Sequence, residues 1–138
     1  MTKQCGILFV GLCGTDDRRL DGLRSLGFRV GESDHLPSTD ELAHYQAVVV
    51  RAHPGSLPMV GTRLRAKQHF GRRILLALVK DGVSDRDKRE AIMCGFDQTL
   101  ADTCTARDIA AHILRLLRAF PEYRCLLRAP NGRRRAAA

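Results

Sequence analysis

The sequence predicts an α/β domain, with a five-stranded parallel sheet and helices on both of its faces. Two observations support this fold class. Short, continuously apolar segments recur along the chain, and such segments are typical of strands that are buried on both faces. Each is followed by an amphipathic segment with helix-capping residues or a terminal glycine. Strands that alternate with helices in this way form parallel sheets.

The strands are predicted from the apolar segments. They are residues 6–10, 28–30, 47–50, 74–79 and 99–101. The segment 47–50, Ala-Val-Val-Val, gives the clearest signal, and 99–101 gives the weakest. We expect an aliphatic core, because tryptophan is absent and aromatic residues make up only 5% of the chain.

The first two helices are predicted from an apolar stripe and a capping motif. Thr15 or Asp16 is placed to cap the first helix, and Gly27 to end it. The stripe of this helix consists of Leu20, Leu23 and Leu26. Ser38 and Glu41 stand at capping-box spacing and predict a short second helix. We expect it to end near residue 45.

The other three helices follow the third, fourth and fifth strands. Pro58 suits the first turn of the third helix, whose apolar residues are Val60, Leu64 and Phe70, with Gly71 at its end. Ser84 and Asp87 open the fourth helix, which carries Ala91 and Ile92 and stops at Gly95. Thr105 and Asp108 have capping spacing for the last helix. Its apolar stripe consists of Ile109, Ile113, Leu116, Leu117 and Phe120.

The length and charge of the chain predict one domain with a basic tail. A chain of 138 residues is the size of a single domain. We place that domain at residues 1–120 and a mobile tail at 121–138. The tail has five arginines and one glutamate, a net charge of +4, which is half of the +8 of the whole chain. The domain itself is therefore only mildly basic, and its charge alone argues weakly for nucleic acid.

Several classes of protein and site are disfavoured by the composition. No segment approaches the roughly 20 apolar residues of a membrane span, and the first residues do not resemble a signal peptide. The five cysteines lack the spacing of a disulfide framework or a zinc site, which favours reduced thiols in the cytoplasm. The five histidines show no ligand or catalytic spacing. We expect a cytoplasmic protein that is not an enzyme and that has no metal, cofactor or membrane partner.

The most informative residue is Arg51, which follows the strand at 47–50. Ligands and chemistry gather at the carboxyl ends of parallel strands. A permanent cation at the centre of that edge argues against a site that holds a divalent metal and accepts a phosphoryl group.

The C-terminal half resembles the receiver domains of response regulators. The segment Ser84-Asp85-Arg86-Asp87-Lys88-Arg89-Glu90-Ala91-Ile92-Met93-Cys94-Gly95-Phe96-Asp97-Gln98-Thr99-Leu100 is similar to their fourth helix and fifth strand, and residues 107–120 resemble their last helix. The resemblance covers residues 6–120. It implies the flavodoxin-like (βα)5 receiver fold, with strand order 2-1-3-4-5.

The same resemblance implies that the phosphorylation site is lost. The paired magnesium-binding acids of receivers fall on Gly11 and Leu12, and the phosphoaccepting aspartate falls on Arg51, or on Val50 if the loop is shifted by one. Magnesium requires hard oxygen ligands, and an aspartyl phosphate requires a carboxylate nucleophile. We therefore identify the chain as a degenerate pseudo-receiver.

The remaining receiver positions also differ from the family pattern. The hydroxyl residue at the end of the fourth strand falls near Val79 or Lys80, the lysine after the fifth strand on about Asp102, and the aromatic switch residue on Thr99. We predict that Arg51 pairs with an acid such as Asp102, which would lock one conformation of the domain.

Two other arrangements of these charges are open. Asp16 and Asp17 either cap the first helix or form a displaced metal site, and we favour the cap. Arg51, His53 and Lys80 form an anion-binding concavity if they face one another.

The function that this combination predicts is signalling through protein–protein interaction, without phosphorylation. The partner is a kinase, regulator or effector, or a second copy of the chain. By resemblance, the contact surface is formed by the fourth helix, fifth strand and last helix, and the first and last helices offer another. The candidate contact residues are Arg89, Met93, Thr99, Arg107 and Ala111.

Two alternatives stay open. One is a nucleic-acid-associated regulator that uses the tail and the basic third helix, and the other is a flavodoxin-like domain that binds a small molecule or an anion.

Overall fold

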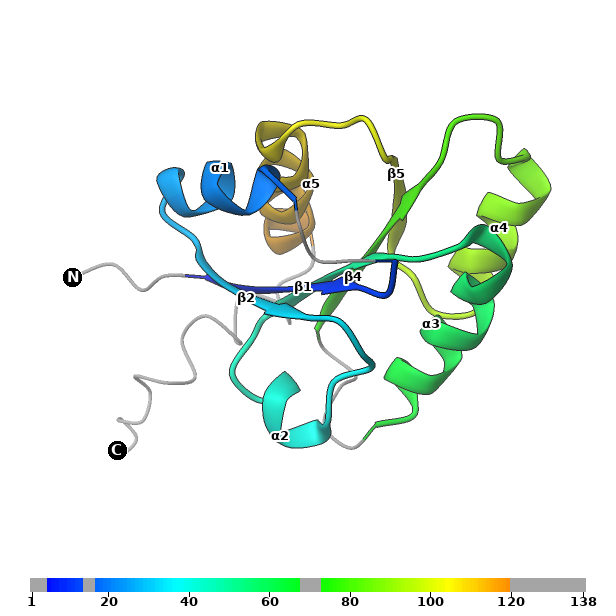
Figure 1. The fold of residues 1–138 in the computed structure, drawn as a ribbon, viewed down its shortest axis with the longest axis horizontal. Coiled ribbons are helices and arrows are strands. Elements are labelled where there is room, and N and C mark those ends of the chain that lie inside the picture. Colours follow the sequence, from blue (N-terminus) through cyan, green and yellow to red (C-terminus); the bar gives the residue numbers. More distant parts are fainter. Residues whose placement is uncertain (1–4, 14–16, 68–72, 120–138) are drawn as a thin grey trace.

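The computed structural model describes residues 5–13, 17–67 and 73–119. Five parallel strands form one sheet in the order β2-β1-β3-β4-β5 (Figure 1), which confirms the predicted fold class and strand order. The strands are β1 (Gly6–Gly11), β2 (Arg29–Ser33), β3 (Ala47–Arg51), β4 (Ile74–Val79) and β5 (Gln98–Ala101). The helices are α1 (Arg19–Ser25), α2 (Thr39–Leu42), α3 (Leu57–Arg65), α4 (Asp85–Met93) and α5 (Ala106–Ala119), and a 3-10 turn, η1 (Pro54–Ser56), precedes α3.

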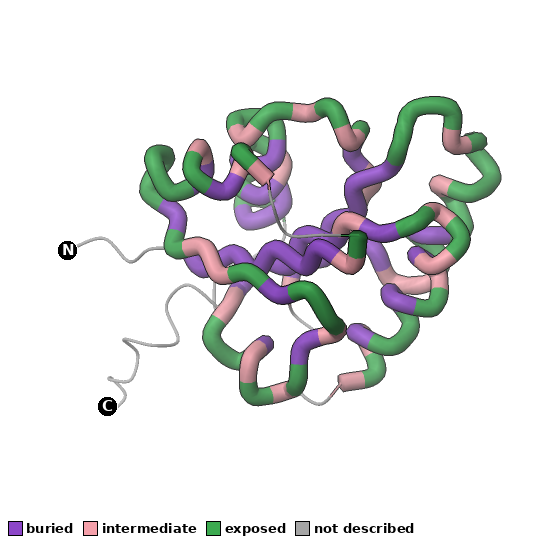
Figure 2. Tube along the Cα trace, viewed as in Figure 1, coloured by how far each residue is buried: buried purple, intermediate pink, exposed green. Residues whose placement is uncertain are grey.

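Helices cover both faces of the sheet, and each face has its own apolar cluster. Alternate residues of β1 and β3, such as Phe9 and Val49, pack with α1 and α5 on one face. Their neighbours Val10 and Val50 pack with α2, α3 and α4 on the other. Figure 2 shows the resulting buried layer through the middle of the molecule. The central strands β1, β3 and β4 are therefore apolar at almost every position.

The capping motifs form as predicted. Ser38 and Glu41 make a reciprocal capping box at the start of α2. The Ser84 hydroxyl accepts a hydrogen bond from the Asp87 N–H at the start of α4. Thr105 and Asp108 bond reciprocally at the start of α5. These side chains satisfy N–H groups that have no partner inside the helix.

Glycines end α1 and α4, also as predicted. Gly27 has φ +100° and Gly95 has φ +127°, values that a residue with a Cβ rarely adopts.

Some predicted boundaries and faces are wrong. β2 extends to Ser33, because its residues pair with β1 from Gly6 to Val10. α2 ends at Leu42, whose carbonyl oxygen accepts a hydrogen bond from the Arg73 Nε. Ile92 is exposed, because Ala91 is the residue of α4 that is buried against the sheet.

Several predictions concern residues outside the described ranges. These are the cap at Thr15 or Asp16, the end of the third helix at Phe70 and Gly71, Phe120, and the tail at 121–138. Within the described ranges, none of the helices has the length and apolar character needed to cross a bilayer.

Candidate functional site

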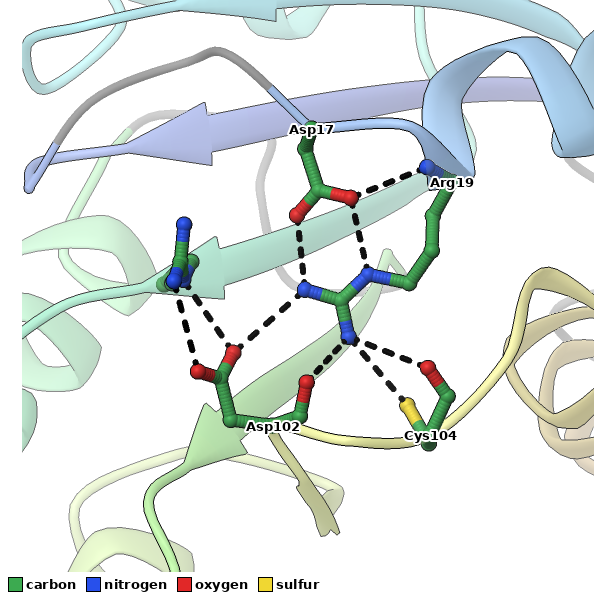
Figure 3. A network of polar contacts seen from close by, with 5 residues as sticks. Asp17, Arg19, Asp102 and Cys104 are labelled. Carbon is green, nitrogen blue, oxygen red and sulfur yellow. Dashed lines mark hydrogen bonds and ion pairs between the residues drawn. The ribbon is translucent and has the colours of Figure 1, made fainter.

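Four charged side chains meet at the carboxyl edge of the sheet (Figure 3). We call Asp17, Arg19, Arg51 and Asp102 the carboxyl-edge network. Arg51 is the last residue of β3, and Asp102 directly follows β5. Asp17 lies just before α1, and Arg19 is the first residue of that helix. The network therefore joins the centre of the sheet edge to its β5 end and to α1.

Arg19 and Asp17 form the tightest pair of the network. The Nη2 of Arg19 lies 2.6 Å from Asp17 Oδ2. The Nε and the backbone N–H of Arg19 both donate to Asp17 Oδ1 at 2.9 Å. Burial alone would raise the pKa of the Asp17 carboxyl, but the hydrogen bonds from Arg19 more than reverse this effect and lower the pKa below its usual value. The hydrogen bond with Asp17 raises the pKa of Arg19 in turn. Both groups are charged at neutral pH.

Asp102 binds two guanidinium groups at once. Arg51 donates from Nε to Asp102 Oδ1 at 3.1 Å and from Nη2 to Oδ2 at 3.4 Å. Arg19 Nη2 reaches the same Oδ1 at 3.3 Å, and its Nη1 donates to the Asp102 carbonyl oxygen at 2.7 Å. The predicted ion pair between Arg51 and Asp102 is therefore confirmed, and it belongs to a larger network.

The backbone on either side of the network is held as well. The Leu12 N–H donates to the carbonyl oxygen of Arg51 at 2.9 Å, and the Asp102 N–H donates to that of Val79 at 2.7 Å. Arg19 Nη1 also contacts Cys104, at 3.2 Å from its carbonyl oxygen and 3.7 Å from its Sγ. Burial raises the pKa of the Cys104 thiol, which favours its neutral form.

The network is balanced in charge and largely shielded from water. Two guanidinium groups face two carboxylates, and the exposed fractions of the side chains are 7% for Asp17, 14% for Arg19, 20% for Asp102 and 34% for Arg51. Each carboxylate is held by at least one arginine. A divalent cation at this edge would have to displace a guanidinium from its acid. The residues present fit an ion-pair network, and they do not fit a magnesium site.

The structure describes one of the two acids considered for a displaced metal site. Asp16 lies outside the described residues, and Asp17 binds Arg19. In the part of the chain that the structure describes, no three histidine, cysteine, aspartate or glutamate side chains are grouped as metal ligands would be.

The other receiver positions implied by the resemblance lie in two parts of the structure, next to β3 and at a cavity beside β5. Gly11 pairs with Arg51 in the sheet register, and Leu12 packs against the apolar cluster on the α3 side. Lys80 and Thr99 line a separate cavity between the β4–α4 loop, α4 and β5. Neither Arg51 nor His53 lines that cavity. Arg51 pairs with Asp102, and the concavity of Arg51, His53 and Lys80 stays a prediction.

Sequence reasoning missed Arg19. It lies at the boundary of a loop and a helix, outside any apolar periodicity, and its partner Asp102 is 83 residues away. The one local signal is Asp17, two residues earlier, but that spacing is not one at which helical side chains meet.

The candidate contact residues stay a prediction, and the structure gives their elements and exposure. Arg89, Met93, Arg107 and Ala111 are exposed on α4 and α5, and Thr99 is half-buried on β5. Met93 is the most exposed large apolar side chain of the described residues, at 85%.

Comparison with known proteins gives structural matches only. No family model matches the chain, and neither does any curated protein. An atypical orphan response regulator, described as having a new phosphorylation-independent regulatory mechanism, superposes with a TM-score of 0.64 at 17% identity, over 83% of this chain and 97% of its own. The chain has the receiver fold.

Two further structures show the range of receiver-fold proteins that match. An orphan response regulator of H. pylori has a TM-score of 0.64 at 16% identity, over 85% of this chain and 99% of its own. The receiver domain of a Pseudomonas aeruginosa sensor histidine kinase, with magnesium in its active-site cleft, has a TM-score of 0.57 at 18% identity, over 81% of this chain and 96% of its own. The predicted resemblance to receiver domains is thus confirmed at the level of the fold.

Proposed function

We propose that this receiver-fold domain acts in signal transduction by binding another protein, without phosphorylation at the end of β3 and without catalysis. The observation that carries the proposal is the pairing of Arg51 with Asp102. At the positions where the resemblance puts the receiver aspartate and lysine, this chain has an arginine and an aspartate. The charges of the pair are exchanged, and the ion pair between them is permanent.

The exchange of charges affects how the domain is controlled as well as whether it can be phosphorylated. A phosphorylatable site changes its charge when it is modified, and this change can drive a conformational switch. The carboxyl-edge network has no nucleophilic carboxylate at the end of β3, and its guanidinium groups stay protonated at any physiological pH. Control would then come from the concentration of the partner or from a bound ligand. The likeness to an atypical orphan regulator described as phosphorylation-independent supports this proposal.

The surface around α4 suits a protein partner. Met93 and Ile92 are 85% and 46% exposed at the end of α4. Arg89 is exposed one turn before Met93, whereas Arg107 lines a groove with Ser25 and Leu26 at the end of α1. Exposed methionine and arginine side chains are frequent in protein interfaces. We infer a partner that presents an apolar side chain next to acidic groups.

We predict that the protein forms no aspartyl phosphate at this edge. The test is to incubate it with magnesium and acetyl phosphate, or with beryllium fluoride, and to record intact mass and amide NMR spectra. We expect an unchanged mass and no saturable shifts around residues 11–13, 51 and 80. The magnesium-binding sensor-kinase receiver domain is a suitable positive control. A phosphoryl adduct would refute this part of the proposal.

We predict that the α4 surface is needed for partner binding. The double variant Arg89→Glu/Met93→Ser should lose at least about tenfold in affinity for a protein captured from the native cell. A matched variant on α3, Arg63→Glu/Met59→Ser, makes the same two changes at exposed positions and should bind normally. Truncation of 121–138 should also leave binding unchanged. Loss of binding on truncation alone would favour the nucleic-acid alternative.

A further inference from the structure

A cavity of about 130 Å³ lies beside the sheet, and none of the four residues of the carboxyl-edge network lines it. It is bounded by the end of β4, the loop that follows it, α4 and β5, at the end of the sheet where α4 lies (Figure 1). Its lining residues are Val79, Lys80, Asp81, Gly82, Lys88, Thr99, Leu100 and Ala101. A cavity of this order, about 150 Å³, is enough for a single benzene ring in another protein.

The cavity exists because small side chains lie under a poorly anchored helix. In the register of β4 and β5, Ala77 is opposite Thr99 and Val79 is opposite Ala101. These residues face α4, since strand neighbours alternate between the two faces. α4 buries only Ala91 and begins with charged residues that stay partly or fully exposed. Among the described residues of α4, Lys88 is the one that lines the space above Thr99 and Ala101.

The charges at this cavity favour a monoanion. Lys80 and Lys88 contribute two ammonium groups and Asp81 one carboxylate, which leaves a net charge of +1. Within the described residues, none of these three groups forms an ion pair. The other side chains that line the cavity are neutral. Lys88 is also half-buried, so part of its side chain packs against the protein.

We propose that this cavity is a binding site for a small monocarboxylate with a compact apolar body. The apolar body would lie against Val79 and Ala101, and the carboxylate would accept hydrogen bonds from Lys80 and Lys88. The Thr99 hydroxyl offers a further donor. Asp81 opposes a second negative charge, which discriminates against phosphate and other dianions. The proposal concerns ligand binding, and it holds whether or not the α4 surface binds a protein.

The test is a titration of the full chain with sodium benzoate, followed by amide NMR at constant ionic strength. We expect saturable shifts confined to residues 79–82, 88 and 99–101. Benzyl alcohol has a similar size and no charge, and it should bind at least about tenfold more weakly because it cannot pair with the lysines. Inorganic phosphate should also bind more weakly than benzoate.

Variants separate this site from general attraction to a basic protein. Lys80→Met/Lys88→Met should weaken benzoate binding by at least about tenfold, whereas Lys67→Met, at the end of α3, should not change it. Thr99→Leu should block the cavity while both lysines remain. Shifts spread over the surface, equal binding of benzyl alcohol, or unchanged affinity in the double lysine variant would overturn the proposal, as would the absence of saturable binding.

Discussion

Replacing Arg51 with aspartate is expected to lower the free energy of unfolding by about 2–3 kcal/mol. The substitution removes two hydrogen bonds to Asp102 and puts a third carboxylate beside Asp17 and Asp102, with Arg19 as the remaining cation of the network. Removing one partner of a fully buried ion pair costs about 3–5 kcal/mol, and the partial exposure of this site reduces that cost. Urea denaturation of the wild type and the variant measures the difference.

A second substitution tests whether the loss comes from charge. Adding Asp102→Lys to Arg51→Asp restores one acid and one base at these positions in the reverse order. The double variant should regain a large part of the lost stability, and the cycle gives the coupling between the two sites. Arg24→Asp is the control, because Arg24 pairs with Asp21 and Glu32 at an exposed place and should cost less than about 1 kcal/mol. Equal losses of stability in Arg51→Asp and Arg24→Asp would show that the carboxyl-edge network stabilises the fold no more than an exposed ion pair does.

Replacing Phe96 with alanine is expected to cost about 3–5 kcal/mol of stability. Phe96 is only 1% exposed and follows the Gly95 turn that ends α4. Its ring packs so closely against α3 that a Cβ on Gly61 would lie 3.0 Å from it. The ring therefore fills the junction of α3, α4 and β5, and its removal leaves a cavity that the surrounding backbone can close only partly.

The control for Phe96 is its apolar neighbour on the surface. Ile92→Ala removes a side chain that is 46% exposed and should cost less than about 1 kcal/mol. Thermal and urea denaturation of both variants would measure the contrast. A small loss for Phe96→Ala would mean that α4 is held to the sheet by other contacts.

The local features of this fold could be predicted because each depends on residues close together in sequence. The strand β4 was predicted at its observed bounds, since six apolar residues in a row leave little choice of structure. The capping motifs at Ser38 and Thr105 formed for the same reason. β2 was harder, because its central residues are not apolar and its length is decided by pairing with β1.

The candidate site could be predicted only in part. Arg51 stood out because it follows the clearest strand, and Asp102 was found through the resemblance. Arg19 and the separate cavity at Lys80 and Thr99 were not found. Both depend on the direction in which a side chain points from a loop or a strand end. The spacing of residues in the sequence does not predict that direction.

The sequence by itself determined the parallel α/β architecture, the presence of a cation at the end of β3, and the absence of carboxylates at Gly11 and Leu12. Hydrophobic periodicity and capping act over a few residues and need no tertiary information. Only the tertiary structure decided which charges pair. It brought together Asp17, Arg19, Arg51 and Asp102 from three strand–helix junctions. Ion pairs between distant loops depend on where the folded sheet ends its strands, and that position exists only once the whole sheet has formed.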